Sequence, residues 1–232
     1  MIVNLQTIVD AAHKEKYAIG AFNCYNYETI KGTIEAASEI NRPVIVAFGA
    51  KYLPNMSLAD AHAIVSSLAS NYDIPICLHL DHCSDLDVIK SAIEVGFTSV
   101  MYDGSMLPYE KNIENTKKVV QLSHSKNVSV EAELGSLATG LESHEGSEND
   151  IEKYTDPQQA KEFVEKTGVD ALAVSIGTVH GLYKGEPNIR IDILKEINEK
   201  VKIPVVLHGG SGTPSNKLRK CITNGIAKIN VN

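Results

Sequence analysis

The sequence contains eight short runs rich in valine, isoleucine and leucine, and longer amphipathic segments alternate with them. Apolar runs of this length are typical of parallel strands that helices cover. Eight such units with short connections predict a closed (β/α)8 TIM barrel, and an open doubly wound sheet is the alternative. We therefore expect one α/β domain over residues 1–232. The expected strands are 18–23, 43–48, 75–80, 98–102, 128–133, 171–176, 204–208 and 227–231, and the expected helices are 27–40, 58–72, 85–95, 109–125, 157–167, 191–200 and 215–223.

The end of the chain departs from a complete set of repeats. The sequence stops at Asn232, directly after the eighth expected strand. Each strand of such a barrel is normally followed by a helix. We therefore expect the barrel to lack its last helix and a C-terminal extension, and the native polypeptide to be longer.

Composition excludes several classes of protein. The net charge is −7 and no basic stripe is present, which argues against nucleic acid as a partner. No apolar run approaches the roughly 18 residues of a membrane span, and residues 1–10 lack the order of a signal peptide. The four cysteines form no CxxC pair. We therefore expect reduced thiols in a cytoplasmic protein that binds neither nucleic acid nor membrane.

Three histidines fall at the ends of three different expected strands, namely His82, His180 and His208. In a barrel these positions meet at the C-terminal mouth. Three neutral imidazoles there bind zinc and leave a fourth position open for substrate. The alternative is that each histidine only forms a hydrogen bond with a loop. His79 shares a strand face with Asp81 and is a candidate for an outer contact to the metal ligands.

A glycine-rich loop, Gly209-Gly210-Ser211-Gly212, follows the seventh expected strand. Backbone N–H groups of glycines and the Ser211 hydroxyl suit an anion, and this loop is the usual phosphate site of such barrels. The alternative is a tight turn that needs positive φ. Lys184, in the loop after His180, is either a charge partner of the phosphate or a solvated lysine.

Carboxylates accompany the same strand ends. Asp81 lies beside a candidate zinc ligand, where it could transfer a proton. Asp103 ends the fourth expected strand, and Glu131 and Glu133 share one face of the fifth. Buried carboxylates are costly unless they are paired or bound to a metal. The two interpretations are therefore metal binding and an ion pair with a core lysine such as Lys228.

Residues 135–155 form a long polar stretch rich in glycine, serine and glutamate. A barrel does not need this stretch, so it is either a mobile lid or a solvated insertion. Glu142 lies within it, where a mobile base could swing over the mouth.

The order of these motifs resembles the class II, metal-dependent ketose-bisphosphate aldolases, which act on fructose and tagatose bisphosphates. Several motifs in one order are far more specific than any one of them. The resemblance runs through almost the whole chain and is carried by Ala21-Phe22-Asn23, Leu78-His79-Leu80-Asp81-His82, Ser99-Val100-Met101-Tyr102-Asp103, Val130-Glu131-Ala132-Glu133-Leu134-Gly135, Val179-His180-Gly181, Leu207-His208-Gly209-Gly210-Ser211-Gly212 and Lys228-Ile229-Asn230-Val231-Asn232.

The resemblance implies roles for single residues. It implies that His82, His180 and His208 hold a catalytic Zn²⁺. It implies that Asp81 is the proton donor and that Glu142 is the mobile-loop base. Many members of the family carry a serine just after strand two, where this chain has Phe48-Gly49-Ala50.

The resemblance also implies further ligands. A second, non-catalytic divalent metal is implied at Asp103 and Glu133, and a monovalent cation near the phosphate. Asn23 is implied as a substrate contact. Members are typically dimers or tetramers, so we expect a homodimer or homotetramer. The residues implied to hold the dihydroxyacetone phosphate part are Gly181, Gly209, Gly210, Ser211, Asn230 and Asn232.

The expected activity is the reversible cleavage of fructose 1,6-bisphosphate or tagatose 1,6-bisphosphate to dihydroxyacetone phosphate and glyceraldehyde 3-phosphate. Such a carbon–carbon lyase belongs to glycolysis and carbohydrate metabolism. Two alternatives are another metal-dependent phosphosugar lyase or isomerase on the same barrel, and a non-catalytic partner subunit. A Schiff base on Lys228 is the other chemical route, and the three histidines favour the metal.

Overall fold

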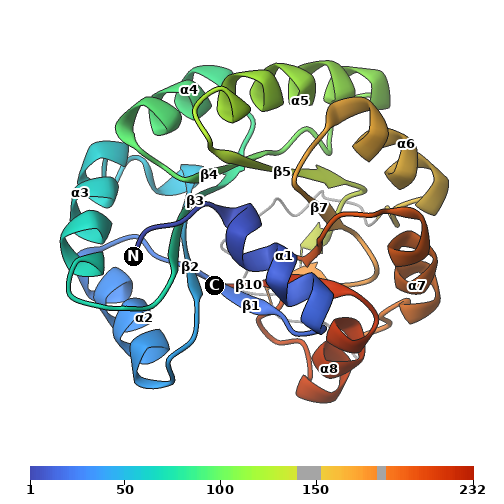
Figure 1. Cartoon of the computed structure of the whole chain (residues 1–232). Helices are drawn as coiled ribbons and strands as arrows, with labels where there is room; N and C mark the ends of the chain where they lie inside the picture. Colours follow the sequence, from blue (N-terminus) through green and yellow to red (C-terminus); the bar gives the residue numbers. More distant parts are fainter. Residues whose placement is uncertain (140–152, 182–186) are drawn as a thin grey trace.

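The computed structural model describes residues 1–139, 153–181 and 187–232. Eight parallel strands close into a barrel in the order β1-β10-β9-β7-β5-β4-β3-β2, which confirms the expected TIM barrel (Figure 1). Every strand neighbours the next one along the chain, as in a barrel built from successive βα units. The barrel strands are β1 (Ile19–Asn23), β2 (Val44–Gly49), β3 (Ile76–Cys83), β4 (Ser99–Tyr102), β5 (Ser129–Leu134), β7 (Ala171–Val174), β9 (Val205–Leu207) and β10 (Ile226–Val231).

The helices between the strands form the outer ring in Figure 1. Four of them begin at a side-chain cap. For example, Asp85 accepts hydrogen bonds from the Asp87 and Val88 N–H groups, and Asp156 precedes the first-turn proline Pro157. The ring consists of α2 (Tyr27–Glu39), α3 (Leu58–Ala69), α4 (Leu86–Val95), α5 (Tyr109–His124), α6 (Pro157–Thr167), α7 (Ile191–Lys200) and α8 (Ser215–Thr223).

One helix, α1 (Leu5–Glu15), precedes the first strand and was not expected. The side chain of Asn4 caps it by accepting a hydrogen bond from the Thr7 backbone at 3.0 Å. Its apolar face, which includes Leu5 and Val9, packs against inward side chains of the strands such as Ala171. Figure 1 shows α1 lying across the barrel opening. The helix therefore closes the N-terminal end of the barrel.

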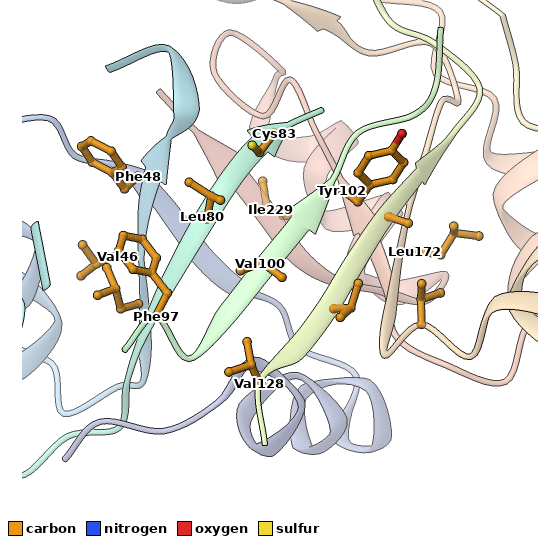
Figure 2. Close-up of a cluster of buried hydrophobic side chains, with 14 of the residues drawn as sticks. Val46, Phe48, Leu80, Cys83, Phe97, Val100, Tyr102, Val128, Leu172 and Ile229 are labelled. Atoms are coloured by element: carbon orange, nitrogen blue, oxygen red, sulfur yellow. The ribbon is translucent and has the colours of Figure 1, made fainter. Parts of the chain in front are cut away.

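The strands are buried on both faces, which explains their continuous apolar runs. Outward side chains such as Val46 and Phe48 pack with Phe97 under the helices, as Figure 2 shows. The Phe48 and Phe97 rings meet edge to face with centroids 6.4 Å apart. Because side chains alternate along β3, Leu80 points outward while its neighbour Asp81 belongs to the polar interior. Polar groups are thus collected inside the barrel.

Two expected strand ends differ in the structure. The third strand was expected to end at residue 80, but β3 runs to Cys83, with a register shift against β4 after Leu80. His82 adopts φ 44° within this irregularity. The sixth strand was expected to reach residue 176, but β7 ends at Val174 because the Ser175 N–H donates to the Thr155 hydroxyl at 2.8 Å instead of to a strand. The chain then forms β8 (Val179–His180), which pairs with β6 (Ala138–Thr139).

The outer face of β1 beside α2 is hollowed by a pocket of about 760 Å³. Gly20, Phe22 and Ala37 are among its lining residues, and Phe22 is 39% exposed. Within the described ranges, none of the helices combines the length and apolarity that a membrane crossing requires.

Candidate active site

Three imidazoles converge at the C-terminal mouth of the barrel. His82 comes from β3, His180 from β8 and His208 directly follows β9. The ring centroid of His82 lies 5.2 Å from that of His180 and 4.5 Å from that of His208. One nitrogen of each ring lies within 4.8 Å of the others, close enough to share one metal ion. The sequence placed His180 at the end of a barrel strand, whereas it reaches the site from the small β6–β8 sheet.

Two carboxylates fix the orientation of two of these rings. His82 Nδ1 lies 2.9 Å from Asp103 Oδ2, and His208 Nε2 lies 2.9 Å from Glu131 Oε1. Each carboxylate thus accepts the N–H of one imidazole, and the opposite nitrogen of each ring would be free for a metal once the proton that these two nitrogens share is lost. Those nitrogens, His82 Nε2 and His208 Nδ1, face each other at 2.8 Å. The pattern of a carboxylate behind each imidazole is the usual outer support of a metal ligand.

The charges of the cluster also suit a cation. Burial works against the imidazolium of His82, but Asp81 and Asp103 outweigh it and raise the pKa of His82 well above its usual value. Burial, followed by the charge of His82, lowers the pKa of His180 to about 3, which keeps that imidazole neutral. Burial, followed by the nearby Asp103, raises the pKa of the Glu133 carboxyl. The negative charges of the site thus favour protonation of His82 and Glu133, and a divalent cation would offset the same charges.

Asp81 lies at the centre of the mouth with one oxygen held and one free. Its Oδ1 accepts a hydrogen bond from Asn230 Nδ2 at 3.0 Å. Its Oδ2 is buried and has no hydrogen-bond partner among the described residues. Burial alone would raise the pKa of Asp81, but the charges of His82 and Lys228 hold it below its usual value. The carboxylate is therefore ionised and has an oxygen available for a proton.

Glu131 and Glu133 have different surroundings although they share one strand face. Lys228 Nζ lies 3.0 Å from Glu131 Oε1 and 2.8 Å from Oε2, so the ion-pair interpretation holds for Glu131. Burial opposes ionisation of Glu131, but Lys228 and His208 lower its pKa to about 2. Glu133 Oε2 lies instead 3.7 Å from His208 Nδ1. Glu131 thus supports a candidate ligand, and Glu133 faces the site itself.

His79 lies below the candidate ligands inside the barrel. Its Nδ1 is 2.8 Å from the Ser99 hydroxyl, and its Nε2 is 3.7 Å from Asp81 Oδ1 and 3.8 Å from Glu131 Oε2. Burial, followed by the charge of Lys228, lowers its pKa to about 4. His79 is therefore a fully buried imidazole between two carboxylates, one of which, Glu131, accepts a hydrogen bond from the candidate ligand His208.

A second set of donor atoms adjoins the first. His82, Asp103 and Glu133 also offer ligand atoms within 4.8 Å of one another. Asp103 Oδ1 accepts hydrogen bonds from the Ser105 backbone at 3.1 Å and from its hydroxyl at 2.7 Å. The two acidic residues expected to hold a second metal are thus brought together by the ends of β4 and β5.

The glycine-rich loop lies against the end of β10. Gly209 has φ 68°, and a Cβ there would collide with the carbonyl oxygen of Val179. The Gly210 N–H donates to the Asn230 carbonyl at 2.9 Å, and the Asn232 N–H donates to the Ser211 hydroxyl at 2.9 Å. The glycine therefore allows a close approach between the loop and β8, and the loop is tied to β10.

The remaining expected residues divide into two groups. Asn23 is buried at the end of β1, and Gly181 follows His180 with φ 90°. Glu142 and Lys184, the expected loop base and charge partner, lie outside the described residues.

A pocket of about 300 Å³ opens beside Asp81 and His82. Lys51, in the turn η1 (Ala50–Tyr52) that follows β2, is among its lining residues. The next residue, Tyr52, donates its hydroxyl to Asn232 Oδ1 at 3.2 Å and so reaches the end of β10. Sequence reasoning missed both side chains, although their position directly after a barrel strand is a signal of function.

Comparison with known proteins gives consistent matches. A family model described as class II fructose-bisphosphate aldolase matches residues 3–232. A crystal structure of the YdjI aldolase from Escherichia coli K12 is 36% identical, with a TM-score of 0.87, over 100% of this chain and 81% of that chain. That of a putative fructose-1,6-biphosphate aldolase from Coccidioides immitis is 30% identical, with a TM-score of 0.91, over 99% and 81%. That of a fructose-bisphosphate aldolase from Campylobacter jejuni is 27% identical, with a TM-score of 0.83, over 99% and 77%.

Proposed function

Because this chain belongs to the class II fructose-bisphosphate aldolase family and is an aldolase, we propose that it reversibly cleaves fructose 1,6-bisphosphate or tagatose 1,6-bisphosphate. The products are dihydroxyacetone phosphate and glyceraldehyde 3-phosphate. One observation carries the proposal: three imidazoles converge within 4.8 Å, next to a buried, ionised carboxylate. An aldol cleavage needs both an electrophile for the carbonyl and a group that takes a proton.

The residues that would hold a catalytic zinc ion are His82, His180 and His208. Their fit rests on the lone-pair nitrogens that Asp103 and Glu131 direct toward one point. Zinc, when bound, polarises the ketose carbonyl and stabilises the negative charge that cleavage leaves next to it.

Asp81 would take the proton from the C4 hydroxyl of the sugar. The C3–C4 bond then breaks, its electron pair stays with C3, and the C4 fragment leaves as the aldehyde. Asn230 donates a hydrogen bond to one Asp81 oxygen at 3.0 Å. This contact fixes the orientation of the carboxylate before the substrate binds, so the other oxygen is already in place to take the proton. Glu142 would then protonate C3 to give dihydroxyacetone phosphate.

The glycine-rich loop would bind the phosphate of the dihydroxyacetone part. Its support is the position after β9, at the loop that binds phosphate in such barrels. Lys184 would add a positive charge, and a monovalent cation would lie near the phosphate. The other groups proposed to contact this half of the substrate are Asn23, Gly181, Gly209, Gly210, Ser211, Asn230 and Asn232.

Asp103 and Glu133 would hold a second divalent metal next to the catalytic one. The second donor set supports this assignment. Family membership further supports a homodimer or homotetramer that works in the cytoplasm on sugar phosphates, in glycolysis or related carbohydrate metabolism.

Product analysis tests the proposed function. The enzyme is incubated with fructose 1,6-bisphosphate and, separately, with tagatose 1,6-bisphosphate, and the products are resolved by ³¹P NMR. Two triose phosphates from one sugar are the expected result. A single rearranged hexose phosphate would identify an isomerase or epimerase, and unchanged sugars would favour the partner subunit.

A further inference from the structure

We propose that the Lys51 ammonium binds the terminal phosphate on the half of the sugar that leaves as the aldehyde. This inference rests on the proposed function, because it assigns the substrate end opposite to the glycine-rich loop. The candidate catalytic set does not include Lys51. It is a specificity-determining residue rather than part of the proton-transfer machinery.

The barrel mouth has two halves that the candidate metal site separates. In the closed strand order, β2, β3, β4 and β5 are contiguous, while β9 and β10 lie across the barrel. The contact of 2.8 Å between His82 on β3 and His208 after β9 bridges the two halves. The phosphate loop after β9 belongs to one half. The pocket of about 300 Å³ belongs to the other, since its described lining residues follow or end β2, β3, β4, β5 and β8.

This division places the two ends of the substrate. With one phosphate at the glycine-rich loop, the dihydroxyacetone carbons lie on the β9–β10 side. The C3–C4 bond must lie near Asp81, which takes the proton of the C4 hydroxyl. Carbons beyond C4 therefore extend into the pocket, whose wall includes Ala50, Met106 and Leu137. Such apolar groups accept a sugar backbone but offer no counter-charge to a phosphate.

Lys51 supplies the missing charge. It is the one lysine or arginine among the described residues that line this pocket. The other charged lining groups are mostly acidic, namely Asp81, Asp103 and Glu133. A dianionic phosphate that enters the pocket next to these carboxylates needs a cation, and an ammonium on a flexible stem binds phosphate as a point charge.

The turn that carries Lys51 is held in place by aromatic packing. Lys51 Nζ lies 5.0 Å from the centre of the Tyr52 ring, and the Tyr52 ring lies 5.1 Å from that of Tyr25. The Tyr52 hydroxyl is bound to Asn232. A Cβ at Gly49 would lie only 3.2 Å from the Tyr52 ring. The glycine after β2 thus lets the tyrosine close against the strand end and sets Lys51 at the pocket wall.

Aldol addition in the synthetic direction tests the inference, because the acceptor aldehyde is then a free choice. The holoenzyme is given dihydroxyacetone phosphate with either glyceraldehyde 3-phosphate or glyceraldehyde. We expect Lys51→Met to raise KM for the phosphorylated acceptor by about 10- to 100-fold, the loss of one charge-assisted contact. Its kcat, and all constants for glyceraldehyde, should stay near wild type. Lys51→Arg should retain most of the preference.

Two controls separate the possible failures. Lys90→Met changes an exposed lysine on α4 and should leave both acceptors unaffected. Exchange of the dihydroxyacetone phosphate C3 proton with solvent D₂O uses no aldehyde and should be unchanged in Lys51→Met. If the wild type shows neither exchange nor addition, the proposed function itself is wrong. If the wild type is active and Lys51→Met has the same KM as the wild type for both acceptors, the role of Lys51 is refuted, whereas the proposed function stands.

Discussion

Glu131 on β5 and Lys228 on β10 form an ion pair that the barrel encloses completely, with Lys228 Nζ 2.8 Å from Glu131 Oε2 and both side chains fully buried. The same carboxylate accepts the N–H of His208 at 2.9 Å. Lys228 thereby offsets a buried negative charge whose function is to orient a candidate metal ligand. A lysine that is paired in this way with a buried carboxylate is disfavoured as a Schiff-base nucleophile.

Lys228→Met should destabilise the fold by about 3–5 kcal/mol, because it leaves Glu131 buried without its counter-charge. Adding Glu131→Gln should restore a large part of that loss, since the amide oxygen still accepts from His208. Urea unfolding of the metal-free single and double variants measures both effects. Lys111→Met is the control: its partner Glu114 lies at 2.9 Å on an exposed helix, and the expected loss is below about 1 kcal/mol. A double variant that is less stable than Lys228→Met would contradict this account.

His79 should make stability depend on pH. Its pKa is lowered from 6.5 to about 4 in the folded state, so the unfolded chain binds a proton more readily between these values. Stability from this group is complete above about pH 6.5 and is lost as pH falls toward 4, by about 3 kcal/mol. His79→Gln cannot titrate and should flatten that part of the profile. Metal-free wild type and variant unfolded in urea at several pH values should therefore differ in slope; equal slopes would show that His79 does not contribute.

Asp81→Asn should lower kcat for sugar cleavage by about 10²- to 10⁴-fold, because the amide cannot take the C4 proton. The hydrogen bond from Asn230 survives, since the amide oxygen still accepts it. Zinc content by mass spectrometry and C3 proton exchange of dihydroxyacetone phosphate should stay within a few-fold of wild type. Asp87→Asn, on the exposed first turn of α4, is the matched control. Cleavage that persists in Asp81→Asn would remove Asp81 from the proton transfer.

Two glycine-to-alanine substitutions should change the free energy of unfolding in opposite directions. Gly209→Ala puts a Cβ at φ 68° against the Val179 carbonyl, so it should destabilise the fold by about 1–3 kcal/mol and weaken binding of dihydroxyacetone phosphate. Gly32→Ala lies within α2, where nothing stands within 4 Å of the new Cβ. It should stabilise by about 0.5–1 kcal/mol. Thermal unfolding and calorimetric titration measure the two effects, and a neutral Gly209→Ala would mean that the loop has room to move.

The sequence predicted the barrel because each strand keeps its apolar run and several helices have recognisable start and stop signals. It missed α1, although Asn4 is a recognisable cap, because a helix before the first strand is outside the βα repeat. The strand-end positions of His82 and His208 were accessible from barrel geometry. The route of His180 through β8 was not, because it depends on the Thr155 hydroxyl replacing a strand hydrogen bond at Ser175.

Contacts between side chains on distant strands of the barrel could not be predicted from the sequence. Glu131 and Lys228 are 97 residues apart, and no local pattern decides whether they meet. The sequence left an ion pair and a metal site as equal interpretations for Glu131 and Glu133. In the structure Glu131 pairs with Lys228, and Glu133 lies among the candidate metal ligands. Lys51 and Tyr52 were missed because they belong to no motif, and only their position directly after a barrel strand marks them.

The most direct test of the central claim is a coupled assay for triose phosphate release from fructose 1,6-bisphosphate and tagatose 1,6-bisphosphate, before and after treatment with EDTA. The account predicts cleavage of at least one sugar, its loss in EDTA and its return on addition of zinc. It further predicts no return in His208→Ala, which removes one of three ligands. Cleavage that persists in EDTA, together with a covalent enzyme–substrate adduct formed on addition of borohydride, would contradict the account and assign the chemistry to a lysine Schiff base.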